Sequence, residues 1–103
     1  MSTLPLRALA PAKINLGLFL GPGRADGRHE LVTVMQSISL ADELTLREAP
    51  PGSARDKVHC PGVPGAPEEN LAARALAAFR AATGWDAPPL ELRIHKRVPV
   101  AAG

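Results

Sequence analysis

The chain has 103 residues and a net charge of +2, with 46% apolar and 21% charged residues. This composition is typical of one small domain or of part of a larger one. It excludes a membrane-spanning helix, since no stretch approaches about 18 apolar residues. Basic residues are scattered and aromatic residues reach only 3%. Nucleic-acid binding, which needs a basic patch and stacking rings, is therefore not expected.

The first predicted strand covers residues 12–20, where apolar and other residues alternate with period two. Glycines and a proline in 21–27 end it and predict a turn. Residues 31–40 are rich in β-branched types and predict a second strand. We expect a short turn at 41–42 and a third strand at 43–48. Short connections between three strands predict an antiparallel sheet.

Residues 49–67 hold five prolines and three glycines and predict a loop within one domain, with a brief edge strand at Lys57–His59. Residues 68–83 predict a helix, with Gly84 as its C-cap. Asn70 is a good N-cap, and a start at Pro67 with two acidic residues in the first turn is the alternative. The helix shows an apolar stripe opposite two arginines: Leu71, Ala72, Ala75, Leu76 and Phe79 against Arg74 and Arg80.

The last predicted strand covers residues 90–98, with Leu90, Leu92 and Ile94 facing inward and Glu91, Arg93 and His95 outward. Strands and helix together predict an α+β fold whose apolar faces one helix can scarcely cover. We therefore expect residues 1–103 to be marginally stable by themselves.

The cysteine and histidine content limits the kinds of site. Cys60 is the single cysteine, which excludes an internal disulfide and favours a reducing compartment. Residues 1–12 hold too little apolar sequence for a secretory signal, so we expect a cytoplasmic protein. His59 and Cys60 have no second cysteine or histidine at ligand spacing, and no metal site is predicted.

Two groups of polar residues are candidates for binding. Lys13 and Asn15 lie two residues apart on the first predicted strand, so their side chains leave one face about 6.8 Å apart. Such a cation and amide can orient an anionic or hydroxyl-bearing ligand. His29 follows the Asp26-Gly27 turn, and its ring can hydrogen-bond a polar heterocycle or a hydroxyl. Spacing alone leaves the alternative open that both groups are ordinary solvated strand residues.

Residues 10–16, Ala-Pro-Ala-Lys-Ile-Asn-Leu, resemble the opening strand of the GHMP kinase superfamily. Within it, residues 24–31 resemble the 4-diphosphocytidyl-2-C-methyl-D-erythritol kinase family, which has Arg-x-Asp-Gly-Tyr-His here and later an Asp-Glu-Leu step like residues 42–44. Residues 70–71 and 96–99 fit the same family. The matches run in the family's order from about residue 8 to the end of the chain.

The resemblance implies part of the GHMP kinase N-terminal domain, a mostly antiparallel sheet with one helix and a left-handed β-α-β arrangement shared with some ribosomal proteins. The general rule for crossovers would favour the right-handed form. The resemblance also implies ATP-dependent phosphorylation, with Mg²⁺, of a hydroxyl of 4-diphosphocytidyl-2-C-methyl-D-erythritol in non-mevalonate isoprenoid (terpenoid) biosynthesis. This small molecule would be the partner, and the oligomeric state stays open.

The resemblance also implies roles for single residues. Lys13 matches the active-site lysine of the family's first strand, Asn15 a substrate-binding asparagine, and His29 the histidine that hydrogen-bonds the cytosine. Arg28 stands where a tyrosine usually stacks on this base, and a guanidinium plane can stack in its place. Four positions match the ATP site: Asn70, Lys96, Pro99 and Gly103. We expect Lys13, Asn15 and His29 to converge on one concave surface.

In the family, a glycine-rich segment that holds the ATP phosphates and a catalytic aspartate follow further along. We therefore expect residues 1–103 to be an incomplete kinase domain that ends inside the phosphate-binding loop and does not turn over ATP alone. Two alternatives stay open, another GHMP small-molecule kinase and a non-catalytic nucleic-acid-binding domain of the same fold. Residues 26–29 disfavour the first, and the absence of a basic stripe disfavours the second.

Overall fold

The computed structural model describes residues 5–102. The elements along the chain are β1 (Leu6–Gly23), β2 (His29–Glu48), β3 (Lys57–His59), the short 3-10 helix η1 (Pro67–Glu69), α1 (Leu71–Thr83) and β4 (Leu90–His95). The strands form one sheet in the order β1-β2-β4-β3, antiparallel except for the β3–β4 pair. The predicted α+β class, with a mostly antiparallel sheet and one helix, is confirmed.

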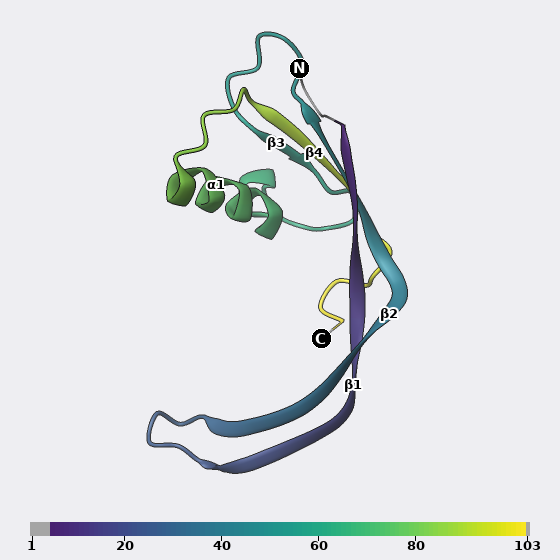
Figure 1. The fold of residues 1–103 in the computed structure, drawn as a ribbon, viewed down its shortest axis with the longest axis vertical. Coiled ribbons are helices and arrows are strands. Elements are labelled where there is room, and N and C mark those ends of the chain that lie inside the picture. The colour runs from purple at the N-terminus through teal and green to yellow at the C-terminus, as the bar shows by residue number, and fades with distance from the viewer. Residues whose placement is uncertain (1–4, 103) are drawn as a thin grey trace.

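β1 and β2 form a long, curved hairpin that extends well beyond the rest of the fold (Figure 1). β4 pairs only with Glu43–Glu48, the last six residues of β2. Most of the hairpin is therefore a two-stranded ribbon, and the radius of gyration is 17.5 Å. A compact domain of this length would have about 13 Å. The molecule thus has a small packed end and an extended arm.

The predicted turn at residues 41–42 is wrong, because β2 runs unbroken through it. Ala41 and Asp42 pair with Pro11 and Ala10 of β1. The irregularity lies just before them, where residues 38–40 face the single residue Ala12 between two paired positions. Extra residues on one strand bend it without ending the pairing. The two predicted strands 31–40 and 43–48 are consequently one bent strand.

The β3, α1 and β4 elements form a β-α-β unit whose two strands are parallel neighbours. Its predicted left-handedness stays a prediction. Both predicted caps are confirmed, since the Asn70 side chain accepts a hydrogen bond from the amide of Ala72 and Gly84 has the left-handed backbone, with φ of 66°. The η1 turn begins at Pro67, which favours a helix start, so the predicted helix is divided at Asn70.

The side of the helix that faces the rest of the fold coincides only in part with the predicted stripe, of which Ala72 and Leu76 are half-buried. Leu71 and Phe79 are 77% and 52% exposed. Arg80, predicted on the solvent side, is half-buried together with Leu76. The reason is a partner that periodicity does not reveal, because Arg80 pairs with Asp56 just before β3. Phe79 instead packs edge-on against Trp85, with ring centroids 5.7 Å apart.

Arg80 joins the helix to the start of both short strands. Its guanidinium donates two hydrogen bonds, of 2.7 and 2.9 Å, to the Asp56 carboxylate and one each to the carbonyls of Ala87 and Pro88. Asp56 also accepts a 2.8 Å hydrogen bond from the amide of Leu90, the most buried side chain. Planar, bidentate pairs of this kind combine charge with fixed geometry. They set where β3, α1 and β4 meet.

β4 ends at His95 rather than at residue 98 as predicted. Leu90 and Ile94 are buried as expected, whereas Glu91, predicted to face outward, is only 6% exposed. β4 lies inside the sheet between β2 and β3, and Glu91 lines a cavity together with prolines of the segments 50–51 and 88–89. The Glu91 carboxylate has a charged partner, because the Arg93 side chain donates a 2.6 Å hydrogen bond to it.

Few apolar side chains are buried in this fold. Among residues 5–102, only Ala41, Val58, Leu90 and Ile94 form the apolar core. Many large apolar side chains of the hairpin are more than 40% exposed, including Ile14, Leu16, Leu18, Phe19, Leu20, Leu31, Val32, Val34 and Met35. No helix in this part of the chain is long and apolar enough to cross a membrane.

The Arg80–Asp56 pair gives a first prediction. R80K keeps the positive charge but loses the planar fork that serves Asp56 and two carbonyls. We expect it to lower the free energy of unfolding by about 2 kcal/mol, read from urea midpoints followed by circular dichroism at low temperature. R74K, on an exposed position of the same helix, is the matched control and should stay within about 0.5 kcal/mol. Equal midpoints for both variants would contradict the role given to Arg80.

The thin core gives a second prediction. A large apolar side chain that stays in water contributes roughly 1.5–3 kcal/mol less to the free energy of unfolding than a buried one. The typical net stability of a domain is only about 5–15 kcal/mol. The 103-residue chain alone should therefore be only marginally stable, that is, aggregated, loosely packed or unfolded at 37 °C. Differential scanning calorimetry tests this. A reversible thermal transition of the monomer above about 60 °C would show that the exposed apolar faces lower the stability by less than we infer.

Candidate active site

The predicted pair Lys13 and Asn15 lies on a short regular stretch of β1. Lys13, Ile14 and Asn15 pair in register with Ser37, Gln36 and Met35 of β2, with a register shift on each side of the stretch. Regular pairing keeps alternate side chains on one face, so Lys13 and Asn15 share a face as expected. Both side chains are exposed. Gly17, the next alternate residue of β1, lies beyond a register shift.

Thr33 on β2 fixes the Asn15 amide and was not singled out from the sequence. Its hydroxyl lies 2.9 Å from Asn15 Oδ1, to which it donates, and 2.9 Å from the carbonyl oxygen of Gly17. With Oδ1 accepting, the Asn15 NH₂ group is left to donate to a ligand. A threonine in a strand rich in β-branched residues carries no special signal, so only the pairing of the two strands reveals this contact.

His29 begins β2 at the closed end of the hairpin, opposite Gly23. Its Nδ1 atom lies 3.3 Å from the carbonyl oxygen of Gly21. A neutral ring that donates from Nδ1 presents Nε2 as an acceptor. Gly21 suits this close approach, because a Cβ atom there would lie 2.8 Å from the Cβ of Glu30.

The turn before His29 is held by its own polar groups. Asp26 accepts a 3.0 Å hydrogen bond from the amide of Arg28, and Gly27 takes the left-handed conformation with φ of 81°. Arg24 forms ion pairs with Asp26 and Glu30 over 3.5 and 3.7 Å. These contacts fix the backbone, and they leave the exposed Arg28 side chain at the tip of the arm.

The two ends of the predicted site lie far apart along the hairpin. Ser37, opposite Lys13, and His29 are eight residues apart on β2, which corresponds to about 26 Å along an extended strand. The curvature of the hairpin shortens the direct path (Figure 1). A ligand that touches both Lys13 and His29 must therefore be elongated. Their predicted convergence on one concave surface stays a prediction.

Lys96 directly follows β4 and is held by Asp42, a residue that sequence reasoning placed in a turn. Lys96 Nζ donates to Asp42 Oδ2 over 2.6 Å, and the two side chains are 26% and 13% exposed. The amides of Arg97 and Val98 donate to Asp42 Oδ1 over 2.7 and 2.8 Å. The Lys96 ammonium and these two amides lower the pKa of Asp42 to about 2.

Lys96 also lines a cavity of about 300 Å³ with His59, Pro61, Arg93, Ile94 and His95. This volume is at the small end of ligand-binding cavities. Asn70, predicted at the same nucleotide site, is not among the lining residues, and its Oδ1 caps α1. Pro99 is exposed, and Gly103 lies outside the described residues. The structure thus supplies a cavity at Lys96 and leaves Asn70 apart from it.

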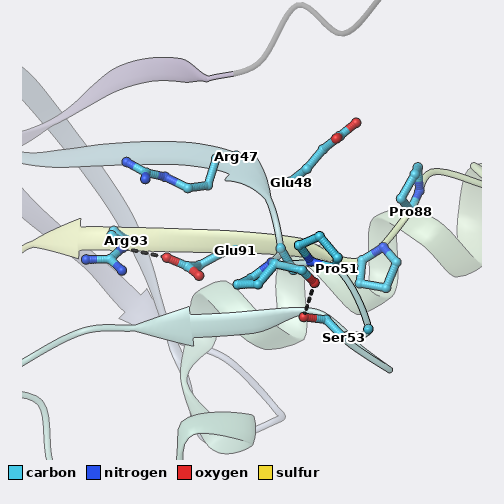
Figure 2. A pocket seen from close by; sticks show the side chains of 11 residues that line it. Arg47, Glu48, Pro51, Ser53, Pro88, Glu91 and Arg93 are labelled. Carbon is cyan, nitrogen blue, oxygen red and sulfur yellow. Dashed lines mark hydrogen bonds and ion pairs between the residues drawn. The ribbon is translucent and has the colours of Figure 1, made fainter.

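A larger cavity of about 660 Å³ lies at the far end of β4, between the segments 47–53 and 88–89 (Figure 2). Its walls include four prolines, Arg47 and Glu48 of β2, and the ion pair of Glu91 with Arg93 on β4. Arg93, through its hydrogen bond, holds the pKa of Glu91 below its usual range. None of the predicted site residues lines this cavity. Within residues 5–102, no three histidine, cysteine or acidic side chains gather as metal ligands.

The known proteins to which this chain is compared below share one enzyme name. No protein-family model matches the chain. A 4-diphosphocytidyl-2-C-methyl-D-erythritol kinase from Anaeromyxobacter dehalogenans (strain 2CP-1) is 50% identical over 95% of this chain and 31% of its own length. That of Gloeobacter violaceus is 47% identical over 100% and 32%. A crystal structure of 4-(cytidine 5'-diphospho)-2C-methyl-D-erythritol kinase superposes with a TM-score of 0.74 at 37% identity, covering 94% of this chain and 33% of that one.

Over nearly its whole length, this chain is similar to 4-diphosphocytidyl-2-C-methyl-D-erythritol kinases. It spans about a third of the length of these kinases. The family resemblance predicted from the motifs at residues 10–16 and 24–31 is confirmed. The roles of single residues of this chain stay predictions.

The Asp42 contacts give a prediction on titration. K96A removes the partner that contributes most to the low pKa, so the Asp42 carboxyl should titrate closer to 3.8, its ordinary value, than to 2. Carboxyl ¹³C chemical shifts followed with pH measure this directly. R97A is the matched control, because it keeps the backbone amide that Asp42 accepts and should leave the midpoint near 2. A K96A midpoint equal to that of the unchanged chain would contradict the assignment.

Proposed function

We propose that this chain forms the substrate-binding arm and part of the nucleotide site of a kinase that phosphorylates a hydroxyl of 4-diphosphocytidyl-2-C-methyl-D-erythritol with ATP. The observation that carries the proposal is the hairpin of β1 and β2. It holds Lys13 and Asn15 at one point and His29 with the turn at Arg28 at its closed end. This arrangement appears in a chain 50% identical to a kinase named for that substrate.

The shape of the proposed substrate suits the arm. A diphosphate links cytidine to the methylerythritol, so the base and the methylerythritol hydroxyls lie at opposite ends of the molecule. Cytosine presents an exocyclic amino group as a hydrogen-bond donor, and His29 Nε2 is an acceptor when Nδ1 donates to Gly21. Arg28 can stack its guanidinium plane on the base. His29 and Arg28 would then bind the cytosine, and Lys13 and Asn15 the methylerythritol end.

In the proposed reaction, the acceptor hydroxyl oxygen forms a bond to the γ-phosphorus of ATP while the bond between γ-phosphorus and bridging oxygen breaks. ADP leaves, and the hydroxyl proton is released. Lys13 would place its ammonium near the acceptor oxygen and stabilise the charge that spreads over the transferred group. The Asn15 NH₂, fixed by Thr33, would orient the hydroxyl. The proton acceptor is not assigned to the described residues.

The cavity beside Lys96 fits a nucleotide base in size, and its lining is partly cationic. Lys96 would hold ATP there. The family match proposes further ATP contacts at Pro99, Gly103 and Asn70, of which Pro99 and Asn70 do not line this cavity. ATP supplies the transferable phosphoryl group, and Mg²⁺ would neutralise charge on its phosphates. Mg²⁺ usually takes one or two protein carboxylates beside the phosphate oxygens, and we assign none among residues 5–102. ATP use and the single cysteine Cys60 favour the cytoplasm.

We also propose that residues 1–103 form an incomplete kinase domain. The relatives are about three times as long, and the arm described here exposes apolar side chains on a ribbon with one ladder of backbone hydrogen bonds. Alone, the chain should show no substrate-dependent ATP turnover.

A chimera tests the proposed function. Residues 1–103 replace the matching third of the Anaeromyxobacter dehalogenans kinase, and ADP release is measured with and without 4-diphosphocytidyl-2-C-methyl-D-erythritol. We expect substrate-dependent release from the chimera, and a fall in kcat of roughly 100-fold or more in K13A. K57A, an exposed lysine on β3, is the matched control and should change kcat less than about twofold. A chimera that folds but ignores this substrate, or a fully active K13A, would overturn the proposal.

A further inference from the structure

Asp42 binds three consecutive residues that follow β4. Its carboxylate accepts from Lys96 Nζ at 2.6 Å, from the Arg97 amide at 2.7 Å and from the Val98 amide at 2.8 Å. The residues are more than fifty positions away in sequence. A charged acceptor makes each of these bonds stronger than a neutral one. The Asp42 side chain is 13% exposed, so water competes little for it.

The position of Asp42 in the sheet explains why it takes this role. The pairing between β2 and β4 ends at Glu43 and His95. Asp42 is the next residue of β2, and its opposite edge still pairs with Ala10 of β1. Beyond His95, the Asp42 side chain therefore takes the place of the backbone hydrogen bonds between β2 and β4. That side chain turns the chain away from the sheet and holds it in a fixed direction.

The lysine that Asp42 holds belongs to a cavity. Lys96 lines the space of about 300 Å³ with His59, Pro61, Arg93 and His95. An ammonium group has three donors, and only one is used on Asp42. A long lysine side chain has many rotamers, and holding it in one conformation has an entropic cost. The hydrogen bond to Asp42 restricts the Lys96 side chain before a ligand binds. The other two N–H donors of the ammonium group are therefore already oriented.

We propose that Asp42 is a positioning residue for the nucleotide: it orients Lys96 and the segment 96–98 so that ATP meets a preformed site. The inference rests on the proposed kinase function, and it adds a residue that the family match did not assign to any role. Asp42 does not touch ATP in this proposal. It acts through Lys96, and its loss should therefore weaken ATP binding while leaving the cytidine end of the site unaffected.

The test uses the active chimera described above. D42N keeps an oxygen that accepts from the amides of residues 97 and 98, but its NH₂ group cannot accept from Lys96. We expect the KM for ATP to rise roughly tenfold, with kcat and the KM for the methylerythritol substrate within about twofold. E43Q is the matched control. Glu43 is the adjacent carboxylate and pairs with the Arg97 side chain over 2.9 Å, yet it does not contact Lys96.

A double-mutant cycle separates positioning from a merely structural role. If Asp42 acts through Lys96, D42N combined with K96Q should raise the KM for ATP no further than K96Q alone. Amide hydrogen exchange at residues 97 and 98 checks that D42N keeps the segment folded. An unchanged KM for ATP in D42N, additive effects in the cycle, or equal increases in both KM values would overturn the inference. Inactivity of the unsubstituted chimera would instead overturn the proposed function, and this inference with it.

Discussion

The bidentate pair of Arg80 with Asp56 is the interaction on which the packed end of this molecule depends. Only four apolar side chains of the described residues are buried, so hydrophobic burial alone specifies little. The guanidinium reaches the Asp56 carboxylate and the carbonyls of residues 87 and 88, and Asp56 binds the amide of Leu90. A planar donor fork and a carboxylate fit in few geometries. This polar cluster therefore defines the angle between helix and sheet where a larger core would otherwise do so.

A second carboxylate defines the other end of β4. Asp56 lies where the strand begins and Asp42 where it ends, and each accepts a backbone amide of the chain that enters or leaves it. β4 is the inner strand that joins the β-α-β unit to the hairpin. The short strand is thus held between two acidic side chains from distant parts of the sequence. Because charge-assisted hydrogen bonds are directional, the segment after β4 leaves the sheet at a defined place beside the cavity at Lys96.

The division into a packed end and an open arm suits the proposed chemistry. A substrate with a base at one end and a hydroxyl at the other needs contacts spread over a distance, and a hairpin provides them at fixed intervals of about 3.3 Å per residue. The bulges near Ala12 and Leu16 bend the arm while the regular stretch between them holds Lys13 and Asn15 on one face. The exposed apolar side chains of the arm remain the main liability of the 103-residue chain.

The sequence by itself determined the type of the strands and of α1, the two helix caps, the turn at Asp26-Gly27 and the family resemblance. These depend on local chemistry: period-two alternation, an asparagine that accepts an amide, a glycine with positive φ, and motifs in a fixed order. Three features were decided only by the tertiary structure, namely the continuity of β2 through residues 41–42, the inward side of α1 and the burial of Glu91. Each depends on parts of the chain far away in the sequence: β1 opposite residues 41–42, Asp56 beside Arg80, and the strands β2 and β3 on the two sides of Glu91. Local periodicity does not reveal such partners. From the sequence alone, a charged side chain is predicted to face solvent, and only the fold shows which carboxylate or guanidinium lies beside it.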